Sequence, residues 1–415
     1  MALAYRCGGD RGLLLLPAGT LLILFAGVAW FLRRRGVGDG ESLALLAVLS
    51  TVLATQLRVV RPQLFSGIGL MLSLLVLDAA ERRGPIRLLW LAPIFALWAN
   101  LHGGWLVGVG VVGLWAVVAA SIRRIPPGWA ALTPCLAILA SLANPYGWRL
   151  WLFLWQTVGL ERADITEWQS VLSQPIALTL WVPGAVVVAV AWWKRRASDL
   201  HRLIPVTVLA LLALKVVRLD ASLAIAAVVM TGPLAAGTGS RRFRLSPAPG
   251  AGELVAVGLA TVAAASVAGW FAWSRAGCMA MGEGLEFTPE SDAVRFAELN
   301  QLAGRMVTWF DYGEYAIWHL SPEIVVSLDG RRETVYSDKV LQAHQRFYDG
   351  RDPGYAQRLG ADYVWVPSRL PLAGQLTKAG WTSIFRGSKS QIFAWRPGHY
   401  EQVGPVPGPR CFPGP

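Results

Sequence analysis

Long apolar runs separated by short, charged loops constrain this 415-residue chain more than any other feature of its sequence. Runs of this length belong either in a membrane or in a very large buried core. Hydrophobic residues make up 54% of the chain and charged residues only 15%, whereas soluble domains average about 25% charged residues. The sequence therefore predicts a polytopic α-helical membrane protein of about ten spans. The expected spans are 13–32, 42–57, 64–79, 88–101, 105–121, 130–143, 176–193, 203–217, 221–236 and 254–273.

The basic residues predict how these spans are oriented. The net charge of +12 is concentrated in alternate loops, which is the pattern of membrane topology and argues against a nucleic-acid partner. The dense basic clusters lie at 33–35, 82–87, 123–124, 194–202 and 241–244, and the other loops carry only scattered arginines. We therefore expect the dense loops to be cytoplasmic and both termini to be outside, in a multi-pass membrane protein.

The segment Trp98-Ala99-Asn100-Leu101-His102-Gly103-Gly104-Trp105 is a polar break between two of these apolar runs. Asn and His are costly at membrane depth unless they face a cavity, a partner or water, and two glycines permit a tight reversal. Two interpretations remain open. The segment either lines a functional site, with His102 in a catalytic role and Asn100 holding a sugar, or it is a turn in which both side chains cap helix ends.

Further polar residues fall on the same predicted outer side. The arginines Arg58, Arg61 and Arg218 are candidates for binding a phosphate, because a guanidinium matches its geometry; the alternative is that they reach to the interface. Carboxylates suited to base or metal chemistry are Glu161, Asp164, Glu167 and Asp220, unless they only cap helices or face solvent. Gln63, Asn144 and Trp168 complete the set, beside an aromatic segment at 150–160 that reads as an interfacial helix.

From about residue 274 the composition becomes that of a small α/β domain. Strands are expected at 306–310, 324–328 and 363–367, with helices between them and a terminal hairpin formed by 381–385 and 391–395. Asp311, Asp329 and Arg331 follow strands, where α/β sheets place ligand contacts. The alternative is a strand-end turn in which Asp329 caps and Arg331 pairs with Asp311 or Glu314.

The ends of this outer domain carry two further expectations. We expect 401–415 to be disordered, because it is rich in Pro and Gly. Cys278 and Cys411 flank the domain on the expected oxidising side, where a disulfide between them and two free thiols are both compatible with the sequence.

The chain carries no phosphate-binding glycine loop, no zinc spacing and no nucleophile elbow. No cofactor is predicted, although the carboxylates leave a divalent metal open.

The order of these motifs resembles bacterial membrane proteins of the GT-C glycosyltransferase type. The residues that carry the resemblance are Arg61-Pro62-Gln63, Trp98 to Gly104, Asn144-Pro145-Tyr146-Gly147, Glu167-Trp168, Phe310-Asp311-Tyr312 and Leu328-Asp329-Gly330-Arg331. The resemblance covers about 40–400 and implies a polyprenyl-phosphate-linked sugar as donor at the outer face. It also implies an envelope glycan or protein as acceptor, arginines that steady the phosphate and a carboxylate that assists the acceptor.

The chain departs from that family pattern at its N-terminal end. The expected first helix and the acidic outer loop are missing, and Asp10 is the only carboxylate in the first twelve residues. The pattern is that of a truncated or non-catalytic relative. Three functions remain: a polyprenyl-phosphate-sugar transferase, a non-catalytic membrane component that binds lipid or glycan, and a solute transporter, which the absence of an inverted repeat disfavours.

Overall fold

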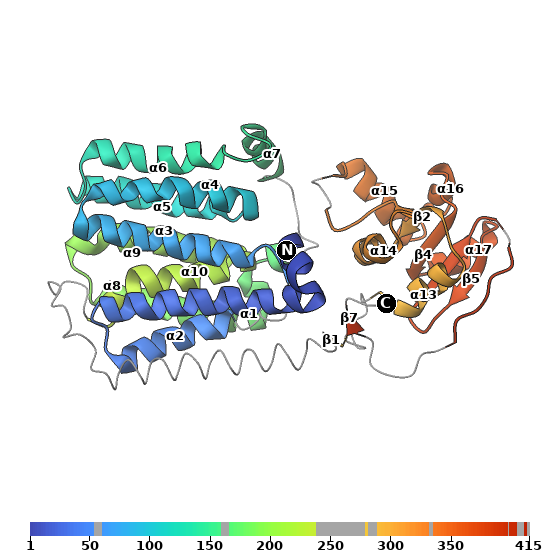
Figure 1. Cartoon of the computed structure of the whole chain (residues 1–415), viewed down its shortest axis with the longest axis horizontal. Coiled ribbons are helices and arrows are strands. Elements are labelled where there is room, and N and C mark those ends of the chain that lie inside the picture. The colour runs from blue at the N-terminus through green and yellow to red at the C-terminus, as the bar shows by residue number, and fades with distance from the viewer. Residues whose placement is uncertain are drawn as a thin grey trace. The chain divides into compact units, whose positions relative to one another are not determined.

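The chain divides into two compact units, Met1–Trp273 and Ser274–Pro415, each described here by itself (Figure 1). The structure, a computed structural model, describes residues 1–53, 60–158, 166–237, 279–280, 289–331, 335–396, 398–404 and 411–412. The first unit is a bundle of helices and the second is built around a small sheet. The change of composition near residue 274 coincides with the boundary between them.

The helices of the first unit follow the apolar runs of the sequence. They are α1 (Ala2–Arg34), α2 (Asp39–Leu53), α3 (Leu64–Arg83), α4 (Leu91–Leu101), α5 (Trp105–Ser121), α6 (Pro127–Ser141), α7 (Arg149–Val158), α8 (Pro175–Trp193), α9 (Leu200–Lys215), α10 (Asp220–Ala226) and α11 (Gly232–Ala235). A π-helical turn at Ala227–Thr231 joins α10 to α11, so the expected run 221–236 is one continuous but locally widened helix. Proline opens α6 and α8 in the first turn, where its missing N–H costs nothing.

Five of the described helices are long and apolar enough to cross a membrane. They are Arg11–Arg34, Leu64–Arg83, Pro175–Trp193, Ala197–Lys215 and Val217–Ala235. Shorter apolar helices cover Pro85–Leu101, Trp105–Ser121 and Pro127–Ser141. The length and composition of these helices therefore indicate a membrane-associated protein. The expected span 254–273 lies outside the described residues, and the total of about ten spans stays a prediction.

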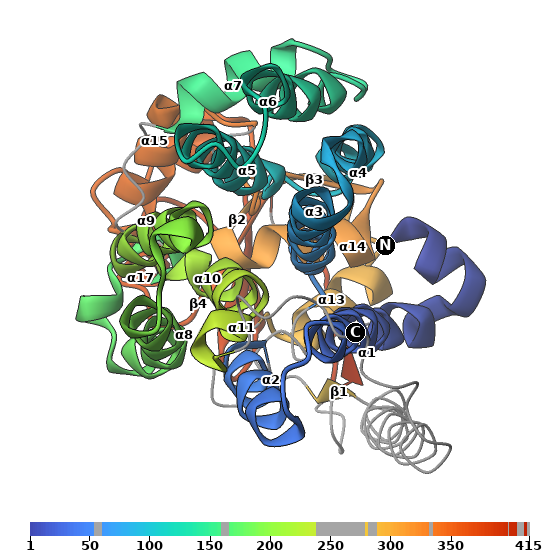
Figure 2. The same ribbon diagram turned by 90° about the vertical axis from the view of Figure 1, so that its left-hand side faces the viewer.

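Helix α3 organises the bundle. It packs against α1, α4, α5 and α10, and the view along the bundle axis places it between α4 and α10 (Figure 2). Its N-terminal turn therefore meets the segment after α4, and its C-terminal turn meets α9. The two ends of α3 (20 residues) are about 29 Å apart, at 1.5 Å of rise per residue. We call them the His102 end and the Arg202 end of the bundle, after the residues they contact.

The second unit has a mixed five-stranded sheet in the order β3-β2-β4-β6-β5. Strands β2 (Gly304–Thr308), β3 (Ile324–Val326) and β4 (Tyr363–Pro367) are parallel, and β5 (Thr382–Arg386) and β6 (Ser390–Ala394) form an antiparallel hairpin. Alternate residues of each strand face opposite sides. Helices α13 (Ser291–Leu299) and α14 (Gly313–Leu320) cover one side, and α15 (Asp338–Tyr348), α16 (Tyr355–Arg358) and α17 (Leu372–Lys378) cover the other. The expected strands and hairpin are confirmed, with shifted ends, while α13 was not predicted.

The expectation of a disordered tail over 401–415 is wrong in part. Cys411–Phe412 (β7) pairs with Met279–Ala280 (β1), and Asn300 exchanges hydrogen bonds with the backbone of Glu401 at 2.8 and 2.9 Å. Backbone pairing offsets the chain entropy that the Pro-rich composition favours. Cys278 lies outside the described residues, so the disulfide remains untested. Cys7 and Cys135 are free thiols.

Candidate functional site

The Trp98 ring packs between α3 and α5, against two positions where only glycine leaves room for it. A Cβ on Gly69 of α3 would overlap the indole ring, and one on Gly108 of α5 would lie 2.6 Å from it. The ring is 2% exposed, and its Nε1–H donates to Ser66 Oγ at 2.9 Å. Trp98 thus fixes both the spacing of α3, α4 and α5 and the position of the Ser66 hydroxyl.

His102 receives two hydrogen bonds on the same ring nitrogen. The backbone N–H of Gly104 donates to Nδ1 at 3.1 Å, and Ser66 Oγ lies 2.7 Å from that nitrogen. Because Nδ1 is an acceptor, the proton of the neutral imidazole is on Nε2. Burial and the positive charge of Arg218 lower the pKa of His102 to about 4. At neutral pH His102 is therefore an uncharged hydrogen-bond donor, which is a poor general base.

A second group of residues at the His102 end is held by ion pairs. Glu167 pairs with Arg61, which precedes α3, and lies 3.9 Å from the Arg218 guanidinium in the short turn η6 (Val217–Leu219). Arg218 also lies 5.4 Å over the Trp168 ring, a cation–π distance. The structure therefore brings together four of the predicted residues, Arg61, Glu167, Trp168 and Arg218, from three distant segments. His102 contacts Ser66 in the first turn of α3, five residues after Arg61, and therefore lies at the same end of the bundle.

Asp220 begins α10, two residues after Arg218. Its side chain is buried, with 5% of the residue exposed, and neither carboxylate oxygen has a hydrogen-bond partner among the described residues. An ionised carboxylate removed from water without a partner costs several kcal/mol. Asp220 therefore differs from Glu167, whose oxygens face two arginines.

Two predicted sugar ligands are used to hold the backbone instead. Asn100 Nδ2 donates to the carbonyl of Ala96 and, at 2.6 Å, to that of Ala143, which ties α4 to the end of α6. Asn144 accepts from Tyr146 N–H at 2.8 Å and donates to the Ser141 carbonyl. For Asn100 these hydrogen bonds match the capping alternative.

The remaining predicted residues at this end are Gln63, three charged residues and the aromatic segment at 150–160. Gln63 precedes α3 without capping it by its side chain, and Arg58, Glu161 and Asp164 lie outside the described residues. The aromatic segment forms α7 as expected. Its Leu150, Trp151 and Leu154 pack on the bundle, while Trp155 is 85% exposed, an arrangement typical of a helix at a membrane interface.

In the second unit, the two predicted strand-end loops are neighbours. A Cβ on Gly313 would overlap the Leu328 carbonyl, and one on Gly330 would overlap the Glu314 carboxylate. Arg331 pairs with Asp329 itself at 2.6 Å, and Tyr336 Oη donates to the same carboxylate at 2.7 Å. Asp311 accepts from Trp309 Nε1 at 3.1 Å. The strand-end turn is thus present with Arg331 paired to Asp329, and the expected pairing of Arg331 with Asp311 or Glu314 stays a prediction.

These contacts control the protonation of Asp329. Burial alone raises the pKa of this carboxyl, but the hydrogen bonds from Arg331 and Tyr336 outweigh it and lower that pKa. Asp329 therefore remains ionised and fully bonded at neutral pH. Its contacts are those of a residue that orders the loop.

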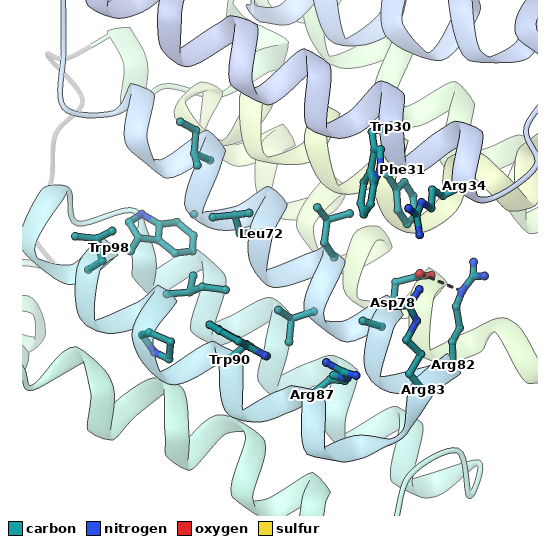
Figure 3. Close-up of a pocket in the computed structure, with 18 of the residues that line it drawn as sticks. Trp30, Phe31, Arg34, Leu72, Asp78, Arg82, Arg83, Arg87, Trp90 and Trp98 are labelled. Atoms are coloured by element: carbon teal, nitrogen blue, oxygen red, sulfur yellow. Dashed lines mark ion pairs between the residues drawn. The ribbon is translucent and has the colours of Figure 1, made fainter. Parts of the chain in front are cut away.

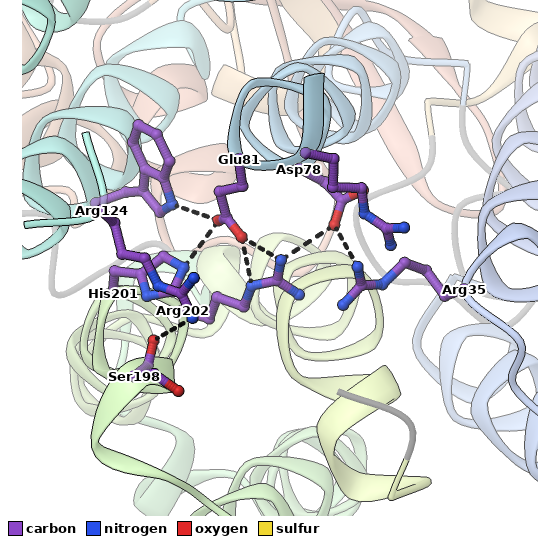
Figure 4. Close-up of polar contacts among 9 residues, drawn as sticks. Arg35, Asp78, Glu81, Arg124, Ser198, His201 and Arg202 are labelled. Atoms are coloured by element: carbon purple, nitrogen blue, oxygen red, sulfur yellow. Dashed lines mark hydrogen bonds and ion pairs between the residues drawn. The ribbon is translucent and has the colours of Figure 1, made fainter. Parts of the chain in front are cut away.

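A buried charge cluster at the Arg202 end was not predicted (Figure 4). Arg202 of α9 donates to Glu81 at 3.1 Å and lies 3.2 Å from Asp78, and Asp78 also pairs with Arg35 at 3.3 Å. Trp115 and His201 contact the other Glu81 oxygen at 3.1 and 2.9 Å. Placing Arg202 in a basic loop was wrong: α9 begins at Leu200 and the residue is 7% exposed. The signal in the sequence was two acids, three apart, in the last turns of an apolar helix.

Among the described residues no group of three or more His, Cys, Asp or Glu side chains is arranged to hold a metal ion. No protein-family model and no curated protein matches the sequence. The assignment of a function therefore depends on the chemistry of the residues at the His102 end.

Proposed function

We propose that the protein is a membrane glycosyltransferase-like protein that binds a polyprenyl-phosphate-linked sugar at the His102 end and transfers the sugar to an envelope glycan or protein. The observation that carries the proposal is the convergence of Arg61, Arg218 and His102, from three separate segments, on one end of an apolar bundle. In this proposal the His102 end and the C-terminal unit face the extracytoplasmic side of a bacterial cytoplasmic membrane.

The groups at this end suit a phosphate. Two guanidiniums present forked donors, and the Nε2–H of His102 adds a neutral one. Glu167 occupies both arginines, so the donor phosphate competes with this carboxylate for them. A neutral His102 binds phosphate oxygen without losing a proton, and its contribution to binding therefore does not change between pH 6 and pH 8, roughly two units above its pKa.

Asp220 is the better candidate for the base in the transfer step. The two Glu167 oxygens already face the guanidiniums of Arg61 and Arg218, whereas both Asp220 oxygens lack partners among the described residues. In the proposed step an acceptor hydroxyl oxygen attacks the anomeric carbon and its proton passes to Asp220. The bond from that carbon to the phosphate oxygen breaks, and polyprenyl phosphate leaves with the electron pair.

A non-catalytic lipid- or glycan-binding role is the second candidate. The observation that favours it is that Nδ1 of His102 already accepts two hydrogen bonds and both Glu167 oxygens face arginines, so two of the three predicted catalytic groups are already engaged. This role requires the same phosphate binding without turnover. The two candidates therefore differ in whether the unaltered protein turns the donor over, and in the consequence of changing Asp220.

The test uses the full-length protein in lipid nanodiscs with a panel of radiolabelled polyprenyl-phosphate sugars. We expect Asp220→Asn to lower transfer or donor hydrolysis by on the order of 100-fold or more with binding retained. Arg218→Gln should weaken donor binding about tenfold. Arg149→Gln, an exposed arginine at the start of α7, is the matched control. Binding without turnover would favour the non-catalytic role, and failure to bind any donor would contradict both.

A further inference from the structure

A cavity of about 850 Å³ runs along α3 between α1 and the segment formed by η2 (Pro85–Trp90) and α4 (Figure 3). Its lining on α3 extends from Phe65 to Arg83, which corresponds to roughly 27 Å at 1.5 Å per residue. One leaflet of the hydrocarbon core is about 15 Å thick. The groove is therefore long enough to hold a complete lipid chain.

The two ends of the groove differ in chemistry. The walls are apolar over most of their length, with Leu72, Trp90 and Leu97 among the side chains. The end toward the start of α3 is lined by Phe65, Trp98 and Leu101. At the Arg202 end the lining changes to a group of arginines. These are Arg34, Arg35, Arg82, Arg83 and Arg87.

The arginines of the groove are not equivalent. Arg35 and Arg82 pair with Asp78 at 3.3 and 3.1 Å, and Arg34 lies 4.9 Å over the Trp30 ring. Arg83 and Arg87 are exposed, and neither forms an ion pair with any residue in the described part of the chain. Figure 3 shows both side chains at the same end of the groove as Asp78 and Arg82. Two guanidiniums at the mouth of an apolar groove match an anionic headgroup attached to a hydrocarbon chain.

We propose that this groove is a binding site for an anionic phospholipid, with its phosphate at Arg83 and Arg87 and one acyl chain lying along α3 toward Trp98. The site is separate from the proposed donor site, because the groove's cations lie at the Arg202 end and Arg61 and Arg218 lie at the other. The inference does not depend on the proposed function. The chain contributes apolar contact along the groove, and the arginines select the charge of the headgroup.

Native mass spectrometry of the delipidated full-length protein, titrated with phosphatidylglycerol, cardiolipin or phosphatidylcholine, tests the site. We expect the anionic lipids to bind at least tenfold more tightly than phosphatidylcholine. The double variant Arg83→Gln/Arg87→Gln should lower that affinity on the order of 30-fold. The matched control is Arg123→Gln/Arg195→Gln, two exposed arginines in other loops, which should leave the affinity unchanged.

A second variant tests the groove itself. Leu72→Trp places a larger side chain in the middle of the lining and should prevent anionic lipid binding while the arginines remain. Equal binding by wild type and both test variants would overturn the proposal, as would equal affinity for phosphatidylcholine. Competition by glycerol phosphate alone would indicate a headgroup site without a chain, and preferential retention of a polyprenyl phosphate would show that the occupant is a different lipid. Arg218→Gln should not alter this binding, which separates the result from that of the donor site.

Discussion

At the His102 end, the space for a single methyl group decides whether the reversal between α4 and α5 can form. Gly104 supplies an N–H to the His102 ring, and its missing side chain leaves room for the Ser66 hydroxyl. Trp98 holds that hydroxyl from the other side. The glycine is therefore required for the hydrogen bonds of two neighbours and not only for the turn.

We predict that Gly104→Ala destabilises the folded protein by about 1–3 kcal/mol, the usual cost of overpacking, because its Cβ would overlap Ser66 Oγ. Thermal unfolding in detergent measures the effect as a lower apparent Tm. Gly103→Ala is the matched control: it is adjacent and exposed, and no atom lies within 4 Å of its added Cβ. An equal loss in both variants would mean that the turn itself, and not the contact with Ser66, demands glycine.

The pKa of His102 predicts how the folding stability depends on pH. Its pKa is lowered to about 4 by burial and by Arg218, from an ordinary value of 6.5. Between these values the unfolded chain binds a proton that the folded chain does not, so folding stability falls as the pH falls from 6.5 toward 4. The neutral variant His102→Gln should therefore lose less apparent Tm than wild type between pH 7 and pH 5. Identical losses in the two proteins would contradict the assigned tautomer and pKa.

At the scale of elements, the bundle is joined at its Arg202 end by charges rather than by apolar contact alone. Arg202 bridges Glu81 and Asp78 of α3, and Asp78 in turn holds Arg35 after α1. The two carboxylates of α3 thus connect this helix to α1, α5 and α9 at one level. Their partners are Arg35, Trp115, His201 and Arg202. A buried ion pair adds little net stability when complete, but removal of one member leaves an uncompensated charge.

We predict that Arg202→Leu destabilises the protein by about 3–5 kcal/mol because it leaves the buried Glu81 carboxylate without an arginine, while Asp78 keeps Arg35 and Arg82. Arg195→Leu, an exposed arginine just before α9, should change the stability by less than about 0.5 kcal/mol. Adding Glu81→Gln to Arg202→Leu should recover part of the loss, since one stranded charge is removed. If the double variant were less stable than the sum of the single changes, the pair would not be coupled as the contacts indicate.

Single strands and helices could be predicted from the sequence more readily than the contacts between them. Strands β2, β4 and β6 were predicted because each is a short apolar run, and the structure shows why: neighbouring residues such as Met306 and Val307 belong to the cores on opposite faces of the sheet. Helix α13 was missed because its short amphipathic run follows residues of mixed character. The meeting of Arg61 with Glu167 was expected only as a shared side of the membrane. The cluster around Glu81 could not be predicted, because the register of α3 against α9 is a tertiary property.

At the scale of the whole chain, alternation of helix direction determines which residues can share a site. Helix α3 carries Ser66 at its start and Glu81 near its end, and α9 carries Arg202 at its start and leads to Arg218. Donor-site residues therefore collect at one end of the bundle and the lipid-groove arginines at the other. The two proposals place their ligands in opposite leaflets, so they can be tested independently.

The predicted topology can be tested with three glycines that tolerate a larger side chain. Gly103, Gly128 and Gly374 are exposed, and a Cβ at each has no atom within 4 Å. In a background with the four native cysteines replaced by alanine, each is changed singly to cysteine and labelled in intact cells with a membrane-impermeant maleimide. We expect Gly103→Cys and Gly374→Cys to react from outside and Gly128→Cys only after permeabilisation. Gly128 begins α6 at the Arg202 end, whereas Gly103 lies beside His102. Reaction of Gly374→Cys together with Gly128→Cys would place the second unit on the cytoplasmic side. That result would rule out the expected span at 254–273, and with it a C-terminal unit that shares the side of the proposed donor site.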